Sequence, residues 1–263
     1  MEHAAGDAID PALADSAGQP WAGRTFEPNA SADDDGSAPP ALIAALEGFR
    51  SGALGEAEVV AAFRASRLLI PLVAEAGDEG LSPHGFRVDK TQELSIVTVA
   101  GPDGRAVLPV FSSVAAMTAW NPTARPVPAA GPRVALAATS EGTELVVLDP
   151  TSDTEFAIRR PALWAIGQEL PWMPSYGDRV VAEAFAASVA EEPSVQTVTL
   201  APGDPTARLL GPELVVQLAL RPGLERAELD ALVARLQDRW AAASVIVGRV
   251  DSMRVSVVRA DSL

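Results

Sequence analysis

Residues 67–73 read RLLIPLV, residues 93–113 read ELSIVTVAGPDGRAVLPVFSS, and residues 114–120 read VAAMTAW. The first run is apolar throughout and has the length of one strand, which is typical of a strand buried on both faces. Pro71 has no amide hydrogen, so we expect this strand at a sheet edge or at a bulge. Together the three segments predict a strand, a hairpin and a short helix.

The hairpin is formed by Glu93–Val99 and Arg105–Phe111. Its connection, GPDG, contains a proline that fixes φ and an Asp-Gly pair that accepts positive φ. The same four residues look like a phosphate-binding loop, but turn formation accounts for each of them. Ser112 or Ser113 then caps the helix Val114–Trp120.

This block resembles the N-terminal domain of the SseB family, bacterial proteins named for an enhanced serine sensitivity phenotype. The resemblance rests on six positions and one tetrapeptide: Arg67, Pro71, Gly101, Asp103, Gly104, Trp120 and Pro109-Val110-Phe111-Ser112. It extends over residues 41–172, and residues 195–260 resemble more loosely the C-terminal part of many SseB-like proteins. The family has no established reaction, so the resemblance implies an architecture and no chemistry.

Length and composition limit the function classes. The chain has 263 residues, of which 48% are hydrophobic, enough for one large or two modest domains with a sizeable core. No apolar run approaches the roughly 20 residues that span a bilayer, and the first 20 residues lack the basic and apolar regions of an export signal. We therefore expect a globular cytoplasmic protein. The lack of cysteine excludes disulfides, thiolate metal sites and a cysteine nucleophile.

The first 39 residues form a separate acidic segment. Through Pro40 the chain has eight acidic residues and one base, Arg24, a net charge of −7 out of a total of −15. The segment has neither a helical nor a strand period, so it cannot bury enough apolar surface to offset the entropy of ordering it. We expect it to be disordered. A solubilising extension is the simpler role, but Trp21 and Phe26 leave docking on a basic partner open.

Charge and motifs argue against nucleotide and nucleic-acid binding. Lys90 is the only lysine, so 19 of the 20 basic residues are arginine, which with abundant Ala, Gly and Pro suggests a GC-rich genome such as that of an actinobacterium. The motif GxxxxGK[ST] is absent, which excludes a phosphate loop of that type. A chain this acidic is poorly suited to bind a phosphate backbone. We expect neither a nucleic acid nor a membrane as partner.

The remaining pattern predicts a mixed α/β (α+β) protein with two small mixed sheets packed with helices. In the first half we expect helices at 41–46, 55–64 and 163–166, and strands at Arg133–Ala138, Glu144–Leu148 and Glu155–Arg159. In the second half we expect helices at Asp178–Ala190 and Leu224–Trp240, strands at Gln196–Leu200 and Glu213–Leu220, and a hairpin of Ser244–Val250 with Met253–Arg259. The predicted organisation is a tail (1–39), an SseB-like domain (40–172) and a C-terminal domain (173–263).

Residues with catalytic potential are few. The motif GxSxG is absent, and the two histidines are His3 in the acidic tail and His84 in a loop at 74–92, where a solvated histidine is the simpler interpretation. The acidic run at 33–35 lacks the spaced ligands of a calcium loop. We therefore expect no enzyme, no metal site and no cofactor.

Three positions remain as site candidates. Asp149 follows a buried strand, where α/β enzymes place catalytic groups, although an Asx turn ahead of Pro150 is the simpler explanation. Arg159 and Arg160 precede a helix, where they could bind an anion or an acidic partner, or be solvated.

The tryptophans divide into two groups. Trp120, Trp164 and Trp240 fall on apolar helical stripes and are expected in the core. Trp172 stands with Met173 among prolines at a domain boundary, where an exposed aromatic would suit a docking surface.

The sequence thus favours a noncatalytic cytoplasmic protein-interaction module of the SseB type. We expect an unknown protein partner to bind at Trp172, Met173, Arg159 and Arg160, and formation of a homo-oligomer is compatible with the pattern. The alternative is a small-molecule-binding or weakly catalytic domain whose site combines Arg105, Asp149 and Arg159 at strand ends. A deep pocket with perturbed pKa values would favour the alternative, and a flat apolar patch or an exposed sheet edge would favour the module.

Overall fold

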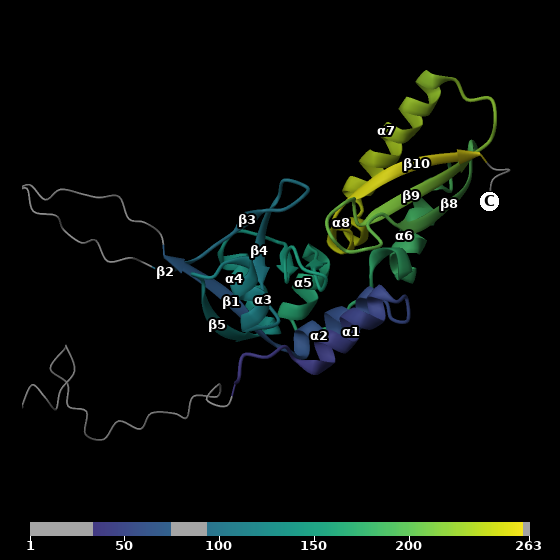
Figure 1. The fold of residues 1–263 in the computed structure, drawn as a ribbon. Coiled ribbons are helices and arrows are strands. Elements are labelled where there is room, and N and C mark those ends of the chain that lie inside the picture. The colour runs from purple at the N-terminus through teal and green to yellow at the C-terminus, as the bar shows by residue number, and fades with distance from the viewer. Residues whose placement is uncertain (1–33, 75–93, 260–263) are drawn as a thin grey trace, which may run out of the picture. The chain divides into compact units, whose positions relative to one another are not determined.

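The computed structural model describes residues 34–74 and 94–259. The chain divides into two units, Met1–Asp35 and Gly36–Leu263, and every described helix and strand belongs to the second (Figure 1). Most of the predicted acidic tail, with Trp21 and Phe26, and the loop containing His84 lie outside the described residues.

The start of the second unit is hydrogen-bonded to the domain. The carbonyl of Gly36 accepts a bond of 2.9 Å from the amide of Val114, and the carbonyl of Ser37 accepts one from the guanidinium of Arg67. These two residues fall within the segment for which the sequence predicts disorder, and both are bound.

The first sheet has the order β2-β1-β5 and is antiparallel. Its strands are β1 (Arg67–Ala74), β2 (Leu94–Ile96) and β5 (Arg125–Ala130). β1 is therefore central, and the expectation that Pro71 marks an edge or a bulge is wrong. Pro71 lies opposite Pro126 of β5 in an uninterrupted register, and pairing with β2 begins only at Leu72. Leu69 exchanges two backbone hydrogen bonds with Phe111, on the side of β1 away from β5. Because backbone direction alternates along a strand, the nitrogen of Pro71 points to that same side, where pairing with β2 has not yet begun, so the proline removes no bond to β5.

The second sheet has the order β3-β4-β6-β7. Its strands are β3 (Val99–Ala100), β4 (Ala106–Val110), β6 (Val146–Leu148) and β7 (Phe156–Ile158). β4 and β6 are parallel, and the other pairs are antiparallel. The predicted GPDG turn joins β3 to β4, and Gly104 has a φ of 83°. The predicted strand 93–99 is divided, because β2 pairs with β1 and β3 pairs with β4.

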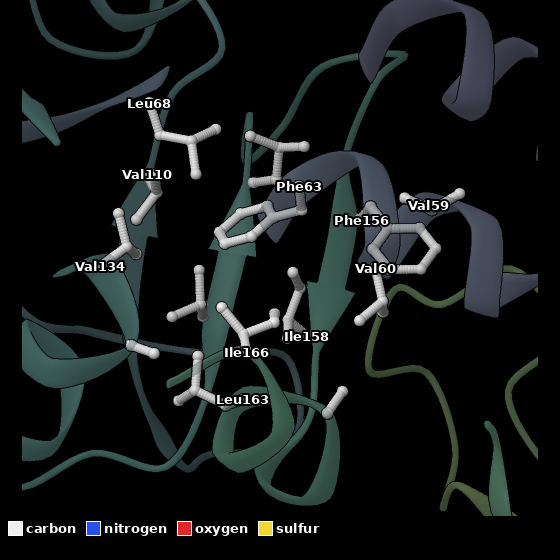
Figure 2. Close-up of a cluster of buried hydrophobic side chains, with 14 of the residues drawn as sticks. Val59, Val60, Phe63, Leu68, Val110, Val134, Phe156, Ile158, Leu163 and Ile166 are labelled. Carbon is white, nitrogen blue, oxygen red and sulfur yellow. The ribbon is translucent and has the colours of Figure 1, made fainter. Parts of the chain in front are cut away.

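Five helices pack on these sheets: α1 (Pro40–Arg50), α2 (Glu56–Ala65), α3 (Val114–Trp120), α4 (Gly131–Ser140) and α5 (Arg160–Gly167). The hydroxyl of Ser113 caps α3 by accepting from the amide of Ala116 at 3.1 Å. Phe63 of α2, Phe156 of β7 and Ile166 of α5 meet in one buried apolar cluster (Figure 2). The helices and both sheets thus share a hydrophobic core.

The predicted strand Arg133–Ala138 is wrong, because these residues lie in α4. Pro132 stands in the first turn of α4, where proline is favoured. Val134 and Ala138 are buried four residues apart on one helix face. This tertiary burial outweighs the strand propensity of the valine.

The C-terminal part contains one three-stranded sheet of order β10-β9-β8. It consists of the short 3₁₀ turn η2 (Ser175–Gly177), helices α6 (Arg179–Val189), α7 (Arg226–Ala242) and α8 (Ser244–Arg249), and strands β8 (Val195–Pro202), β9 (Leu214–Leu220) and β10 (Met253–Arg259). β8 is antiparallel to β9, whereas β10 is parallel to it. Leu236 and Trp240 of α7 and Phe185 of α6 fill the core beside β9.

The predicted terminal hairpin is wrong. Residues 244–249 form the helix α8, so the chain crosses from β9 through α7 and α8 to the parallel strand β10. Ile246 and Val250, four residues apart, are both buried. This spacing places both side chains on one face of a helix, so burial again favours a helix where the sequence predicts a strand. Mixed α/β architecture is confirmed, with three sheets where the sequence predicts two. No helix in the described residues is long and apolar enough to cross a membrane.

Candidate functional site

Arg159 is a buried arginine surrounded by acceptors. It follows β7 and directly precedes α5, and only 6% of its surface is exposed. Its Nη2 donates to Oδ2 of Asp204 at 2.7 Å and to the carbonyl of Gly211 at 2.9 Å. Its Nη1 donates to Oδ2 of Asp251 at 3.3 Å and to the hydroxyl of Ser252 at 3.4 Å. Each of the two terminal nitrogens of the guanidinium therefore makes two hydrogen bonds within the protein itself.

Arg105 approaches the same carboxylate. Its two Nη atoms donate to the two oxygens of Asp251 at 3.1 and 3.0 Å, and its Nε donates to Asp103 at 2.8 Å. Burial alone would raise the pKa of Asp251, but the hydrogen bonds from Arg105 and the charge of Arg159 hold it below its ordinary value. We call Arg105, Arg159, Asp204 and Asp251 the ionic cluster.

The ionic cluster joins the two halves of the second unit. Both arginines come from the part that runs from α1 to α5, whereas both carboxylates come from the part that runs from η2 to β10. The loop 203–212 also contacts the part that runs from α1 to α5. The carbonyl of Ala207 accepts a hydrogen bond from the amide of Ala157 at 2.7 Å, and Leu209 packs with Val107 and Val147. The cluster therefore holds the junction in place.

A second contact across the junction involves an unusual carboxylate. The hydroxyl of Tyr176 donates to Oε1 of Glu56 at 3.0 Å. Burial, assisted by repulsion from Glu213, raises the pKa of Glu56 to about 7 despite this hydrogen bond. Burial also raises the pKa of Glu213, whose carboxylate accepts from the amides of Ser175 and Asp251 at 3.3 and 2.6 Å.

Asp149 does not belong to the ionic cluster. It is 1% exposed, and its carboxylate accepts from the amide and the hydroxyl of Ser112, both at 2.7 Å, and from the hydroxyl of Thr154 at 2.9 Å. It thereby ties the end of β6 to the end of the parallel strand β4. The structure brings two members of the predicted small-molecule site, Arg105 and Arg159, together and leaves the third elsewhere.

Among the tryptophans that the structure describes, Trp164 is the exposed one, not a core residue as the sequence predicts. α5 buries Ala162, Leu163 and Ile166, and Trp164 points away from that face with 42% of its surface exposed. The guanidinium of Arg160 lies 5.1 Å from its ring centroid. Trp240 is buried and Trp120 partly buried, as predicted for core positions.

The predicted docking residues are distributed differently. Trp172 is partly buried and packs against the core of Figure 2, whereas Met173 is exposed. Arg159 is buried in the ionic cluster. Arg160 donates to the carbonyls of Val247 and Val250 at 2.9 and 2.7 Å, which places it against the end of α8.

A groove of about 370 Å³ opens beside Arg160. It is lined by α7, α8 and the first residues of β10: Arg160, Gln237, Trp240, Ala241, Ile246, Val247 and residues 250–255. Val247 and Met253 are exposed. Since Arg160 also stacks on Trp164, the tryptophan and the groove form one surface, which we call the Trp164 surface.

A separate groove of about 530 Å³ lies beside Arg105 and is lined also by Asp103, Leu210 and Ser252. Within residues 34–74 and 94–259, no group of three His, Cys, Asp or Glu side chains is placed to hold a metal ion.

One comparison with known proteins gives a match. Residues 42–165 match the family model described as SseB protein N-terminal domain. This part of the chain is an SseB N-terminal domain. The resemblance seen in the sequence is thereby confirmed. No curated protein and no solved structure matches the chain.

The SseB domain so defined contains Arg105, Asp149, Arg159 and Arg160, and it contains Trp164 one residue before its end. The acidic partners in the ionic cluster lie beyond it. Sequence reasoning missed Asp204 and Asp251 because each stands in a turn, where an acidic residue is ordinary. Glu56 stands in the first turn of α2, where an acidic residue is likewise ordinary, and no sequence signal marks it as buried.

Proposed function

We propose that the chain is a noncatalytic cytoplasmic module of the SseB type that binds a protein partner through the Trp164 surface. The observation that carries this proposal is an exposed tryptophan beside a partly apolar groove. Tryptophan and arginine are the residues that most often dominate binding energy at protein interfaces, and here they stack on each other. The proposed anchor is therefore Trp164 in place of Trp172, whose ring is partly buried.

The state of the charged residues supports a binding role over a catalytic one. A catalytic or anion-binding arginine needs donors that face the ligand. In the ionic cluster the donors of Arg105 and Arg159 face Asp103, Asp204 and Asp251 instead. The strongly shifted pKa of Glu56 has a structural origin in burial at the junction.

Affinity capture from the native host, read by quantitative mass spectrometry, tests the proposal. We expect a partner whose recovery falls at least tenfold with Trp164→Ala. Leu210→Ala is the matched control, because Leu210 is also an exposed apolar residue and lines the other groove. Equal recovery with wild type and Trp164→Ala, at unchanged melting temperature, would contradict the proposal.

A small-molecule site is the second candidate, favoured by the groove beside Arg105. Such a ligand would have to compete with Asp103 and Asp251 for the guanidinium. A thermal-shift screen of small dianions, with phosphate and succinate as first probes, tests it. Stabilisation that disappears in Arg105→Gln would favour this candidate.

A further inference from the structure

The strand β10 lies at the edge of its sheet. In the described part of the chain it pairs only with β9, in parallel register from Met253 to Arg259. An edge strand presents unpaired backbone groups that can pair with a further strand. β10 is seven residues long and continuous, which is long enough for such pairing.

The register identifies which backbone groups face outward. The carbonyl of Ser252 accepts from the amide of Leu214, so residue 252 points toward β9. Because backbone direction alternates along a strand, Arg254 and Ser256 also point toward β9. The amides and carbonyls of Met253, Val255 and Val257 therefore point away from the sheet.

The side chains of these outward-facing residues border the two grooves at the ends of β10. Val255 packs against the core under α7, and Met253 and Val257 are 37% and 46% exposed on the same face of the strand. The Trp164-surface groove lies at the beginning of β10. Another groove, of about 560 Å³, lies at the other end of β10. It is lined by Val257, Val258, Leu229 and residues 220–224.

The charge of this edge is opposite to that of the chain. The two grooves are lined by three arginines, Arg160, Arg221 and Arg254, and by one acidic residue, Asp251. Asp251 is paired in the ionic cluster, and Arg160 lies 3.9 Å from the carboxylate of the exposed Glu144. The chain as a whole carries a net charge of −15. A partner segment rich in acidic residues is therefore favoured here and disfavoured by most of the remaining surface.

We propose that β10 accepts an extended segment of a partner protein as a fourth strand, in which apolar residues alternate with acidic ones. This inference rests on the proposed function, because it takes the partner to be a protein, and it adds the chemistry of the bound segment. The apolar side chains lie on the face of Met253, Val255 and Val257 and enter the grooves. The acidic side chains lie on the opposite face, where Arg254 is the arginine that pairs with them, whereas Arg160 and Arg221 add positive charge at the two ends of the strand. Backbone pairing supplies affinity, and the alternating side chains supply specificity.

A short peptide tests the proposal directly on the full chain. The probe is a fluorescently labelled peptide of seven residues in which glutamate and valine alternate, matched to the length of β10. We expect saturable binding, at least tenfold tighter than that of a peptide in which lysine replaces glutamate. Equal affinity for the two peptides, or no saturable binding, would overturn the proposal.

Two pairs of variants identify the edge. Val257→Pro removes an outward amide and leaves the bonds to β9 intact, and proline is tolerated on edge strands; we expect at least tenfold weaker peptide binding. Met253→Pro repeats the change at the other end, should one variant fail to fold. Arg254→Glu should weaken binding by a similar factor, whereas Arg133→Glu, an exposed arginine of α4, should leave it unchanged. Unchanged affinity in folded Val257→Pro and Met253→Pro would overturn strand addition.

The outcomes separate this proposal from the proposed function. If Trp164→Ala abolishes partner capture while the proline variants bind the peptide normally, the interaction module stands and strand addition is wrong. If the proline variants lose the peptide while Trp164→Ala retains the partner, the edge is the binding site and the Trp164 anchor is wrong. A dimer in light scattering that Val257→Pro abolishes would overturn the proposal in favour of pairing between two copies.

Discussion

Two parallel strand pairs occur in this protein, β4 with β6 and β9 with β10, and they differ in their neighbours. β4 and β6 are flanked by β3 and β7, so each has a paired strand on both sides. In the described residues β10 has β9 on one side and no strand on the other. The parallel pair of the SseB domain therefore lies inside its sheet, whereas the parallel pair of the C-terminal part includes the edge strand of its sheet. The difference teaches that the family match and the proposed binding edge lie in different parts of the chain.

The two pairs also differ in the carboxylate at their ends. Asp149 follows β6 and is held by neutral donors of Ser112 and Thr154. Asp251 precedes β10 and is held by the guanidinium groups of Arg105 and Arg159. The first carboxylate closes a loop within one domain, whereas the second fastens the junction between two parts.

Asp251→Asn is the substitution with the largest expected effect. It removes the bidentate partner of Arg105 and one of the two carboxylates beside the buried Arg159, and we expect a loss of about 3 to 5 kcal/mol in the free energy of unfolding. Asp149→Asn, which disturbs neutral hydrogen bonds, should cost about 1 to 3 kcal/mol. Urea denaturation of both variants measures the difference. A larger loss for Asp149→Asn would break the distinction between the two carboxylates.

Leu236→Ala tests the core under the open pair. Leu236 is fully buried between α7 and β9, so we expect a loss of about 2 to 5 kcal/mol from lost burial and the remaining cavity. Asp238→Ala, at an exposed position of the same helix, should change stability by less than about 0.5 kcal/mol. Similar losses in the two variants would show that α7 turns a different face to the sheet.

Glu56→Gln should stabilise the protein, and the gain should grow as the pH rises from 4.5 to about 7. The pKa of Glu56 is about 7 in the folded chain and 4.5 in its ordinary state, so between these values the folded state binds the extra proton. Wild type therefore loses stability as the pH rises through this window, and above it the penalty reaches about 3 kcal/mol at most. Glutamine still accepts the hydrogen bond of Tyr176 and has no such penalty. Melting curves at pH 4 should coincide for the two proteins, and those at pH 8 should separate.

Trp164→Ala should have the smallest effect on stability. Its ring is half-exposed and loses mainly the contact with Arg160, which at exposed sites is worth about 0.5 to 1 kcal/mol. A shift of several degrees in the melting temperature would mean that Trp164 supports the fold, and the capture experiment would then need Arg160→Ala as its second variant.

Local sequence signals predicted secondary structure correctly where a residue type has a single structural role, as in a helix cap or a turn. The expected serine cap is Ser113, α3 has the bounds that the sequence predicts, and the GPDG turn joins the strands it was expected to join. The strand predictions failed at 133–138 and 244–250, because burial at a spacing of four residues decided between helix and strand. The prediction for Pro71 failed because the sequence did not reveal where the pairing of β2 with β1 begins.

Only the two arginines of the ionic cluster could be predicted from the sequence. Arg105 and Arg159 could be chosen from their positions near strand ends, and both contact Asp251. Their partners could not, because Asp204 and Asp251 lie 45 and 92 residues beyond Arg159 in turns. Long-range pairing of this kind leaves no periodic pattern in a single sequence.

The sequence separation in the ionic cluster has a consequence for synthesis on the ribosome. Asp251 follows Arg159 by 92 residues, which at about 5 to 20 residues per second takes roughly 5 to 18 seconds to translate. During that interval the nascent SseB domain carries Arg159 and Arg105 without their shared counter-charge. Before residue 251 is made, Arg105 has Asp103 and Arg159 has Asp204 as an acidic partner, so the two guanidinium groups are only partly neutralised. Closing the junction then becomes the final step in the maturation of the chain.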